Sequence, residues 1–434
     1  MKQNENMSNT QSMDNSKSKL NIRWTFVILL LIGAVVNYLD RANLSVANTT
    51  IAREFHLSST KMGLLLSAFL WPYAIANLPS GWLVDKFGPK KMFSFASGFW
   101  STATIICSFV SSYPIFYAMR MILGVAESPF FTAGLKVNQK WFSDEERGLP
   151  VAIINTGSQI SNAIAPPILT ILLVAFGWRS MFVIIGVLGI LVLLVWQKLY
   201  RDPTSEETLA IKGSLEAAKE AREGKKSEKQ ASWGELFKHK RTWFMIMGNF
   251  GIMFTIWVYL TWLPSYLQKE RGFSLTQSGF VASLPYICGI VGVLLGGSIS
   301  DRLIKKGVQP ITSRKFPIVG GAILAAVATA PLPFIKSTTI IIVLLCIGYF
   351  ASQLPSGVIW TLAADVAPSN QVASLGAIQN FGGFLGAAMA PIVTGIILDK
   401  TGTIGSVFLI GAALLILGAI SYGIFVKPSL SEEA

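Results

Sequence analysis

Apolar residues in this chain come in long, nearly unbroken runs that short polar segments separate. Each run is long enough to cross about 30 Å of hydrocarbon as a helix, at about 1.5 Å per residue. A water-soluble fold would instead show short alternating strands or helices with one polar face. The runs predict twelve membrane-spanning helices at about 24–47, 61–84, 91–111, 113–136, 148–174, 178–198, 242–267, 276–300, 315–335, 338–362, 371–398 and 403–426.

The polar segments divide the chain into two bundles of six spans each. The predicted divisions are a polar tail over 1–23, a first bundle over 24–198, a charged central loop over 199–241, a second bundle over 242–427 and a short tail over 428–434. The first tail lacks the apolar core and the cleavage site of a signal peptide. The predicted fold class is therefore an all-α membrane protein of two pseudo-symmetric six-helix bundles.

The positive charges predict how the chain is oriented in the membrane. With the N-terminus inside, 26 of the 36 Lys and Arg residues fall on the inner side, 7 on the outer side and 3 within spans. Because inner connections of membrane proteins are enriched in Lys and Arg, both termini are predicted to be cytoplasmic. The net charge of +13 is then a topology signal. No module that stacks on bases or reads a groove accompanies it, so no nucleic-acid partner is expected.

Composition argues against an enzyme. Hydrophobic residues make up 52% of the chain, and charged residues make up 14%, well below the roughly 25% of a soluble domain. Three cysteines without paired spacing and two histidines in polar connections give neither a metal cluster nor a nucleophile with its base. The sequence therefore predicts no metal, no cofactor and no catalytic residues.

Two sequence patterns occur once in each half. The pattern Gly81–Lys91 follows the second span, and a degenerate copy, Gly297–Lys306, follows the eighth, 216 residues later. An Asn-x-Gly and Ala-Pro pattern over 155–166 recurs over 380–391. Two similar halves of this kind predict a cavity between bundles that rock against each other.

These segments carry a resemblance to a known family. Gly81–Lys91 resembles the loop signature of the major facilitator superfamily, and 37–44, 120–127 and 261–266 resemble its anion:cation symporter family, which includes bacterial galactonate, glucarate and hexuronate carriers. The resemblance implies an importer of a small organic anion together with protons, by alternating access. Two fused halves make a monomer the expected state. The implied substrate is a sugar acid (an aldonate, aldarate or hexuronate), and the implied location is a bacterial cytoplasmic membrane.

Ionisable residues inside the spans are the first candidates for function. They are Asp40, Arg41, Arg120 and Glu127. Each costs roughly 2.5–3.5 kcal/mol at mid-bilayer, so each is expected to face a cavity or a partner. Helix counting places both arginines in the outer half, roughly 10 Å from that surface. Two guanidinium groups at one depth suit a carboxylate, which a planar guanidinium binds bidentately.

Glu127 lies seven residues after Arg120, on nearly the same helix face and about 10 Å deeper. Gly124 between them is expected to leave open space at the backbone. Our hypothesis is that Asp40 and Glu127 carry protons and that Arg41 binds the substrate carboxylate. Arg120 either shares that role or holds one of the two acids in the empty state. The alternative is that the four residues form buried ion pairs that only align helices.

The family resemblance also implies neutral groups for the substrate hydroxyls. These are Tyr73, Gln159, Trp360 and Asn380. Tyr38 lies one turn before Arg41 on the same face and is a further candidate. Amides and phenols supply the donors and acceptors that a hydroxylated anion needs. The same side chains also serve as ordinary hydrogen bonds between helices, so that alternative stays open.

The two loop signatures predict gating residues. They are Asp85, Lys86 and Lys90 in the first copy and Asp301 and Arg302 in the second. A carboxylate at the end of the second span, beside cations and a helix N-terminus, can latch the halves together on the cytoplasmic side. Lys136, near the inner end of the fourth span, is expected to extend its ammonium group toward the interface between membrane and water. The alternative is a solvated loop whose charges only set the topology.

Two other transport modes compete with proton-coupled symport. An uncoupled facilitator or exchanger of organic anions would explain the arginines but would leave Glu127 without a role. A drug/proton antiporter would need acids for its cations and a Gly-Pro-x-x-Gly-Gly bend, whereas the fifth span carries Ala165-Pro166-Pro167. The paired arginines favour an anion carrier.

Overall fold

The computed structural model describes residues 2–143, 146, 148–209, 211, 236–367 and 372–426. Side chains are described from residue 22 onward within these ranges, except at 372 and 373. Every regular element in these ranges is a helix. Most of the central loop, over 212–235, and the C-terminal tail lie outside the described residues.

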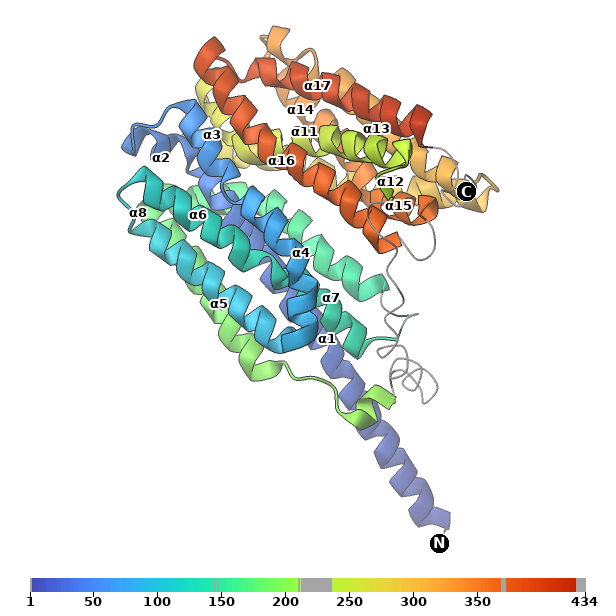
Figure 1. Ribbon diagram of the computed structural model, residues 1–434. Coiled ribbons are helices and arrows are strands. Elements are labelled where there is room, and N and C mark those ends of the chain that lie inside the picture. The colour runs from blue at the N-terminus through green and yellow to red at the C-terminus, as the bar shows by residue number, and fades with distance from the viewer. Residues whose placement is uncertain are drawn as a thin grey trace.

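The first half of the chain forms one helical bundle, drawn in blue to green in Figure 1. Its helices are α1 (Lys2–Val46), α2 (Asn48–Glu54), α3 (Ser59–Ser67), α4 (Leu70–Phe87), α5 (Pro89–Ser108), α6 (Tyr113–Glu127), α7 (Pro129–Trp141) and α8 (Gly148–Leu199). The polar tail predicted over 1–23 belongs to α1 from Lys2 onward. No glycine or proline interrupts 2–21, so the tail has no residue that would end the helix.

The second half forms the other bundle, drawn in yellow to red. Its helices are α11 (Lys240–Arg271), α12 (Leu275–Lys305), α13 (Pro310–Thr329), η1 (Leu332–Phe334), α14 (Thr338–Gln353), η2 (Pro355–Gly357), α15 (Ile359–Val366), α16 (Val372–Thr401), α17 (Gly405–Ile420) and the π-helical η3 (Ser421–Phe425). Figure 1 shows the two bundles side by side, joined by the central segment.

The helices combine into the predicted twelve crossings. Within the described residues, 9 helical stretches are long and apolar enough to span a membrane. One of them, Gly148–Leu199, is two helices that meet at Gly177, whose φ of 78° only glycine adopts easily. The pair α6–α7, interrupted at Ser128 before Pro129, and α5 supply the other two crossings. The second and tenth spans are likewise broken, into α3–α4 and α14–η2–α15.

Matching capping residues mark the repeat in the structure. The Ser58 side chain accepts a hydrogen bond from the Lys61 amide at the start of α3. Ser274, 216 residues later, forms a full capping box with Gln277 at the start of α12. The same offset separates the two loop signatures. The two halves therefore begin their second helices with the same local chemistry.

The hydrogen bonds between described residues of the two bundles gather at the end that carries α2, here called the α2 end. Ser45 Oγ donates to the Thr261 carbonyl at 3.0 Å, and Ser67 Oγ donates to the Ala388 carbonyl at 2.7 Å. A buried apolar cluster crosses the interface at the same end, whereas a second cluster lies mainly within the first bundle. The bundles are thus fastened to each other at the α2 end.

Candidate substrate and proton site

An ion pair buried in the first bundle joins α1 to α6. Arg41 Nε lies 2.7 Å from Glu127 Oε2, and the two side chains are 9% and 0% exposed. Glu127 Oε1 and Arg41 Nη2 are also buried, and neither has a hydrogen-bond partner among the described residues. Arg41 can therefore donate a further hydrogen bond, and Glu127 can accept one, so either residue can bind an additional partner or exchange the present one.

Three aromatic rings surround the Arg41 guanidinium. Its central carbon lies 4.7 Å from the Tyr38 ring centroid, 4.8 Å from that of Phe69 and 4.6 Å from that of Tyr73. These distances are within the range of cation–π attraction, which gains strength away from water. The rings fix the planar fork in place, and α1 and the junction of α3 with α4 position it.

Asp40, the neighbour of Arg41, is held by neutral donors. Asn43 Nδ2 donates to one carboxylate oxygen and Thr104 Oγ1 to the other, each at 2.7 Å. Asp40 is 0% exposed, and Arg120 and Glu127 are its charged neighbours. The acid is therefore buried without a direct cation, in contrast to Glu127.

Arg120 does not have the role of an ion-pair partner in this structure. It is 3% exposed, its Nε has no hydrogen-bond partner, and no carboxylate of the described residues lies within 4.0 Å. The sequence hypothesis that Arg120 holds an acid in the empty state differs from the structure, where Arg41 holds Glu127. Depth explains this, since Arg120 and Glu127 are seven residues apart on one helix and therefore about 10 Å apart along its axis, whereas Arg41 reaches Glu127 from α1.

Gly124 also differs from expectation. A Cβ at this position would clash with the carbonyl oxygen of Phe69 and lie 3.1 Å from the Tyr73 amide nitrogen. The glycine therefore lets α6 pack directly against the α3–α4 junction, where the prediction was open space. It brings the Phe69 and Tyr73 rings to Arg41 and so contributes to the site through packing.

The neutral candidates are more dispersed. Tyr73 is 5% exposed and touches the second bundle through Phe384 of α16, with the ring centroids 5.5 Å apart. Trp360 of α15 is 55% exposed, and its ring lies 3.7 Å from a Cβ built at Gly376, one turn before Asn380. Gln159 and Asn380 are half-buried. Tyr73 thus joins the charged group, and Trp360 and Asn380 share a second region.

Several buried polar residues of these regions are additions to the predicted set. Thr104 binds Asp40, and Asn37 is fully buried beside Glu127. Gln379, 2% exposed, donates to the Ile359 carbonyl at 3.1 Å. Asn37 lies one turn before Arg41, so helix periodicity could have identified it. Thr104 gives no such signal, because threonines are common on ordinary helix faces.

Comparison with known proteins assigns the family. Residues 30–391 match the model of the Major Facilitator Superfamily. The chain belongs to this superfamily. It is 36% identical over 411 residues to a probable L-galactonate transporter of Escherichia coli K12, covering 95% of this chain and 91% of that protein.

A second relative and a solved structure agree with this assignment. A probable galactarate/D-glucarate transporter of Escherichia coli K12 is 33% identical over 406 residues, which are 90% of this chain and 91% of that protein. A bacterial homologue of the lysosomal transporter Spinster, solved in an inward-facing occupied conformation, has a TM-score of 0.76 at 17% identity, covering 94% of this chain and 98% of its own. The resemblance to sugar-acid carriers and the two-bundle fold are confirmed, and the protein is a membrane transporter, not an enzyme.

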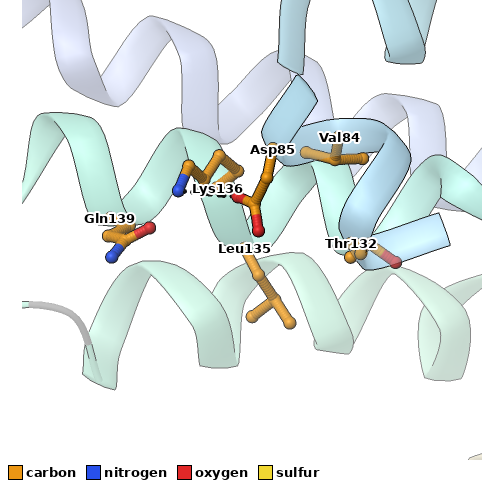
Figure 2. Close-up of a pocket in the computed structure, with 7 residues that line it drawn as sticks. Val84, Asp85, Thr132, Leu135, Lys136 and Gln139 are labelled. Carbon is orange, nitrogen blue, oxygen red and sulfur yellow. Dashed lines mark ion pairs between the residues drawn. The ribbon is translucent and has the colours of Figure 1, made fainter. Parts of the chain in front are cut away.

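The two predicted gating carboxylates, Asp85 and Asp301, form ion pairs within their own bundles. Asp85 Oδ1 lies 2.8 Å from Lys136 Nζ, and Figure 2 shows the two side chains pointing toward each other from α4 and α7. The Lys86 ammonium lies 4.8 Å from the Trp82 ring centroid. Lys136, expected to extend toward the interface between membrane and water, is thus an ion-pair partner of Asp85. In this conformation the carboxylate does not latch the two halves.

The second copy of the signature behaves in the same way. Asp301 Oδ1 lies 3.1 Å from Arg314 Nη1, and Arg314 Nε lies 3.5 Å from Asp365 Oδ2. Arg302 and Lys90 have no ion pair within 4.0 Å among the described residues. A cavity of about 330 Å³ beside Asp85 and Lys136 is lined also by Gly81, Thr132 and Gln139. These charges lie at the end opposite α2, where no described hydrogen bond joins the bundles.

Proposed function

We propose that this transporter imports a sugar acid together with protons, as a symporter. The observation that carries the proposal is the buried pair of Arg41 with Glu127. A substrate carboxylate can offer Arg41 a bidentate partner in place of the single Nε–Oε2 contact that Glu127 makes now. When the anion takes the guanidinium, Glu127 becomes an unpaired carboxylate in a dry site and takes up a proton, because burial disfavours its charge. Anion and proton then bind together.

Asp40 is proposed as the second proton carrier. It lies beside Arg41 in sequence, and its charged neighbours are Glu127 and Arg120. A proton on either acid changes the stability of charge on the other, so the two are expected to titrate as a coupled set. Arg120, which has no ion pair among the described residues, is available for the substrate.

The neutral side chains are proposed to recognise the hydroxyl groups of the substrate. Tyr38 and Tyr73 already contact Arg41, and Gln159, Trp360 and Asn380 lie on α8, α15 and α16. The relatives named above are probable transporters of L-galactonate and of galactarate or D-glucarate, which supports an aldonate or aldarate substrate. A hydroxylated chain needs several neutral donors and acceptors in addition to a cation for its carboxylate.

We further propose a monomer in a bacterial cytoplasmic membrane with both termini inside. Under that topology the α2 end faces outside and is closed here, so the conformation is inward-facing. Alternating access would then exchange the contacts at the α2 end for contacts among Asp85, Lys86, Lys90, Asp301 and Arg302 at the inner end.

Uptake into proteoliposomes tests this function. Labelled L-galactonate, galactarate, glucarate, glucuronate and a non-sugar carboxylate are each offered with and without an inward proton gradient. We expect one sugar acid to accumulate above equilibrium and to leave when the gradient is dissipated. Equal uptake with and without the gradient would overturn coupling and favour a facilitator or exchanger. No uptake of any sugar acid would overturn the substrate class.

A further inference from the structure

A second polar cavity lies at the α2 end, between the two bundles. Its volume is about 490 Å³, and residues of α2 and its following turn face residues at the end of α11. The residues that matter here are Thr49, Arg53, Leu57, Gln268, Lys269 and Phe273. A hydrogen bond of 2.8 Å from Thr49 Oγ1 to Gln268 Oε1 crosses between the bundles beside it. The cavity therefore has one wall from each half.

Each wall contributes one cation, and no carboxylate lines the cavity. Arg53 comes from the first bundle and Lys269 from the second, and both side chains are exposed. Neither forms an ion pair within 4.0 Å in the described part of the chain. Two like charges facing one space raise its positive potential, and low-dielectric walls focus that potential further.

The acidic neighbours of these cations are bound elsewhere. Glu54, next to Arg53, accepts from Trp178 Nε1 at 2.6 Å and pairs with Arg179. Burial of Glu54 opposes its ionisation, but the hydrogen bonds from Trp178 and Arg179 outweigh burial and hold its pKa below the usual value. The Glu54 carboxylate is therefore bound by Trp178 and Arg179, outside the cavity, and does not pair with Arg53.

The second bundle repeats this arrangement. Glu270, next to Lys269, accepts from Thr403 Oγ1 at 3.0 Å and from the Ile404 amide. Asp399, whose charge also acts on Lys269, accepts from the amides of Ser59 and Thr60, each at 2.8 Å. Each acid near the cavity thus has other donors, and the cations face the open space.

The two cations are equivalent positions of the internal repeat. Arg53-Glu54 and Lys269-Glu270 are separated by 216 residues, the same offset that relates Asp85 to Asp301. Each half therefore has a cation that lines the cavity, followed by an acid that binds partners within its own bundle. The cavity combines these two equivalent cations only because the bundles meet at this end.

We infer that this cavity is an anion-capture vestibule for the carboxylate substrate. The inference rests on the proposed function, since it takes the substrate to be an anion and the α2 end to face outside. Thr49 lies eight residues after Arg41, so the vestibule is about 12 Å from the central site along the chain direction of α1 and α2. An anion held between Arg53 and Lys269 is concentrated at the outer face that opens toward Arg41 once the bundles separate there, and its rate of capture rises without any change in the chemistry of the central site.

Transport kinetics test the vestibule directly. The double variant Arg53→Gln/Lys269→Gln is compared with Lys336→Gln, which removes an exposed cation at the same end that does not line the cavity. With the sugar acid that the native protein transports, we expect the KM of the double variant to rise about 3- to 10-fold at low salt with the maximal rate unchanged. In about 0.5 M salt the difference should vanish, because surface electrostatics are screened there. A KM equal to that of Lys336→Gln at low salt would overturn the inference.

A second measurement does not need transport. Arg53→Cys is introduced in a background without the three native cysteines, and its reaction rates with anionic and cationic membrane-impermeant methanethiosulfonates are compared in oriented vesicles. We expect the anionic reagent to be favoured, and adding Lys269→Gln to lower that preference several-fold, whereas Lys336→Gln leaves it unchanged. An unchanged preference, or labelling only from the inside, would overturn the vestibule even where uptake succeeds. The expected preference in a protein that moves no sugar acid would retain the vestibule and overturn only the proposed substrate.

Discussion

The two bundles share a fold but differ in what they bury. In the described residues, the buried acids and the buried Arg120 all lie in the first bundle, as Asp40, Glu127 and Arg120. Among its described residues, the second bundle buries only neutral polar groups, including Asn249 and Gln379. Because internal pseudo-symmetry gives both halves equivalent positions, this difference is a matter of side chains and not of architecture. It supports the proposal that the charge chemistry lies in the first bundle.

The neutral network of the second bundle is nearly self-contained. Asn249 Nδ2 donates to the Gln379 carbonyl at 2.9 Å, and Gln379 Nε2 donates to the Ile359 carbonyl at 3.1 Å. Tyr422 OH lies 3.3 Å from Gln379 Oε1. These bonds fix α11, α15 and α16 beside Trp360 and Asn380. Loss of one neutral bond is worth about 1 kcal/mol, whereas an unpaired buried charge costs several.

The largest effect is expected from Arg41→Gln. The variant leaves Glu127 as a buried carboxylate without its cation, at a cost of about 3–5 kcal/mol, and it removes the proposed anchor for the substrate. Uptake and counterflow should both fall at least about 100-fold in proteoliposomes. Thr156→Ala is the control for a polar side chain away from the pair, because this exposed hydroxyl donates to the Ala152 carbonyl of its own helix. Counterflow near the native rate in Arg41→Gln would break the assignment of charge chemistry to the first bundle.

Glu127→Gln should separate coupling from movement. The amide keeps the shape of the acid but cannot carry a proton, so accumulation should fall to the equilibrium ratio while counterflow stays within a few-fold of native. Asp40→Asn is the companion variant, because it keeps the bonds to Asn43 and Thr104 within reach. Accumulation that persists in both variants would remove proton coupling from these acids and favour the exchanger.

Asn380→Ala examines the second bundle in the same assay. Loss of one hydrogen bond to a substrate hydroxyl should raise the KM about 5- to 10-fold, consistent with about 1 kcal/mol. The accumulation ratio should be unchanged, since no titratable group is altered. A loss of accumulation with a native KM would mean that the second bundle takes part in coupling, and the contrast between the halves would fail.

Much of the fold could be predicted from the sequence, because hydrophobic run length reports directly on the membrane. The breaks within spans were harder, since Ser128 before Pro129 and the junction at Ala68 look like ordinary helix residues until packing is known. The long helix from Lys2 was also missed as an element, because polar composition suggested only a tail.

The site was predictable as a set of residues but not as a set of partners. Membrane depth identified Asp40, Arg41, Arg120 and Glu127, because charges in hydrocarbon are costly. Which arginine meets Glu127 depends on how α1 and α6 pack in three dimensions, and the structure shows that it is Arg41 of α1. The capture vestibule depends on the closed contact between the halves, which no local pattern encodes.

The smallest effect is expected from a substitution at the contact between the bundles, where it changes the balance between the closed and open states of the α2 end. Asp399 of α16 accepts from the amides of Ser59 and Thr60 at the start of α3, so it caps a helix of the opposite bundle. Asp399→Asn keeps one acceptor and loses the charge, at a cost of about 1 kcal/mol to the closed state, which corresponds to a shift of a few-fold between states. Labelling of Asn162→Cys, in a small cavity between the bundles, by an impermeant maleimide should then become about 2- to 5-fold faster.

Glu270→Gln is the matched control for this last variant. Glu270 makes the same kind of bonds at the same end, to Thr403 and the Ile404 amide, but within its own bundle. Its loss should therefore leave the labelling rate at Asn162→Cys unchanged. Equal acceleration in both variants would mean that loosening either bundle opens the interface. Acceleration in Asp399→Asn alone would make the helix cap between the bundles a specific determinant of the closed α2 end.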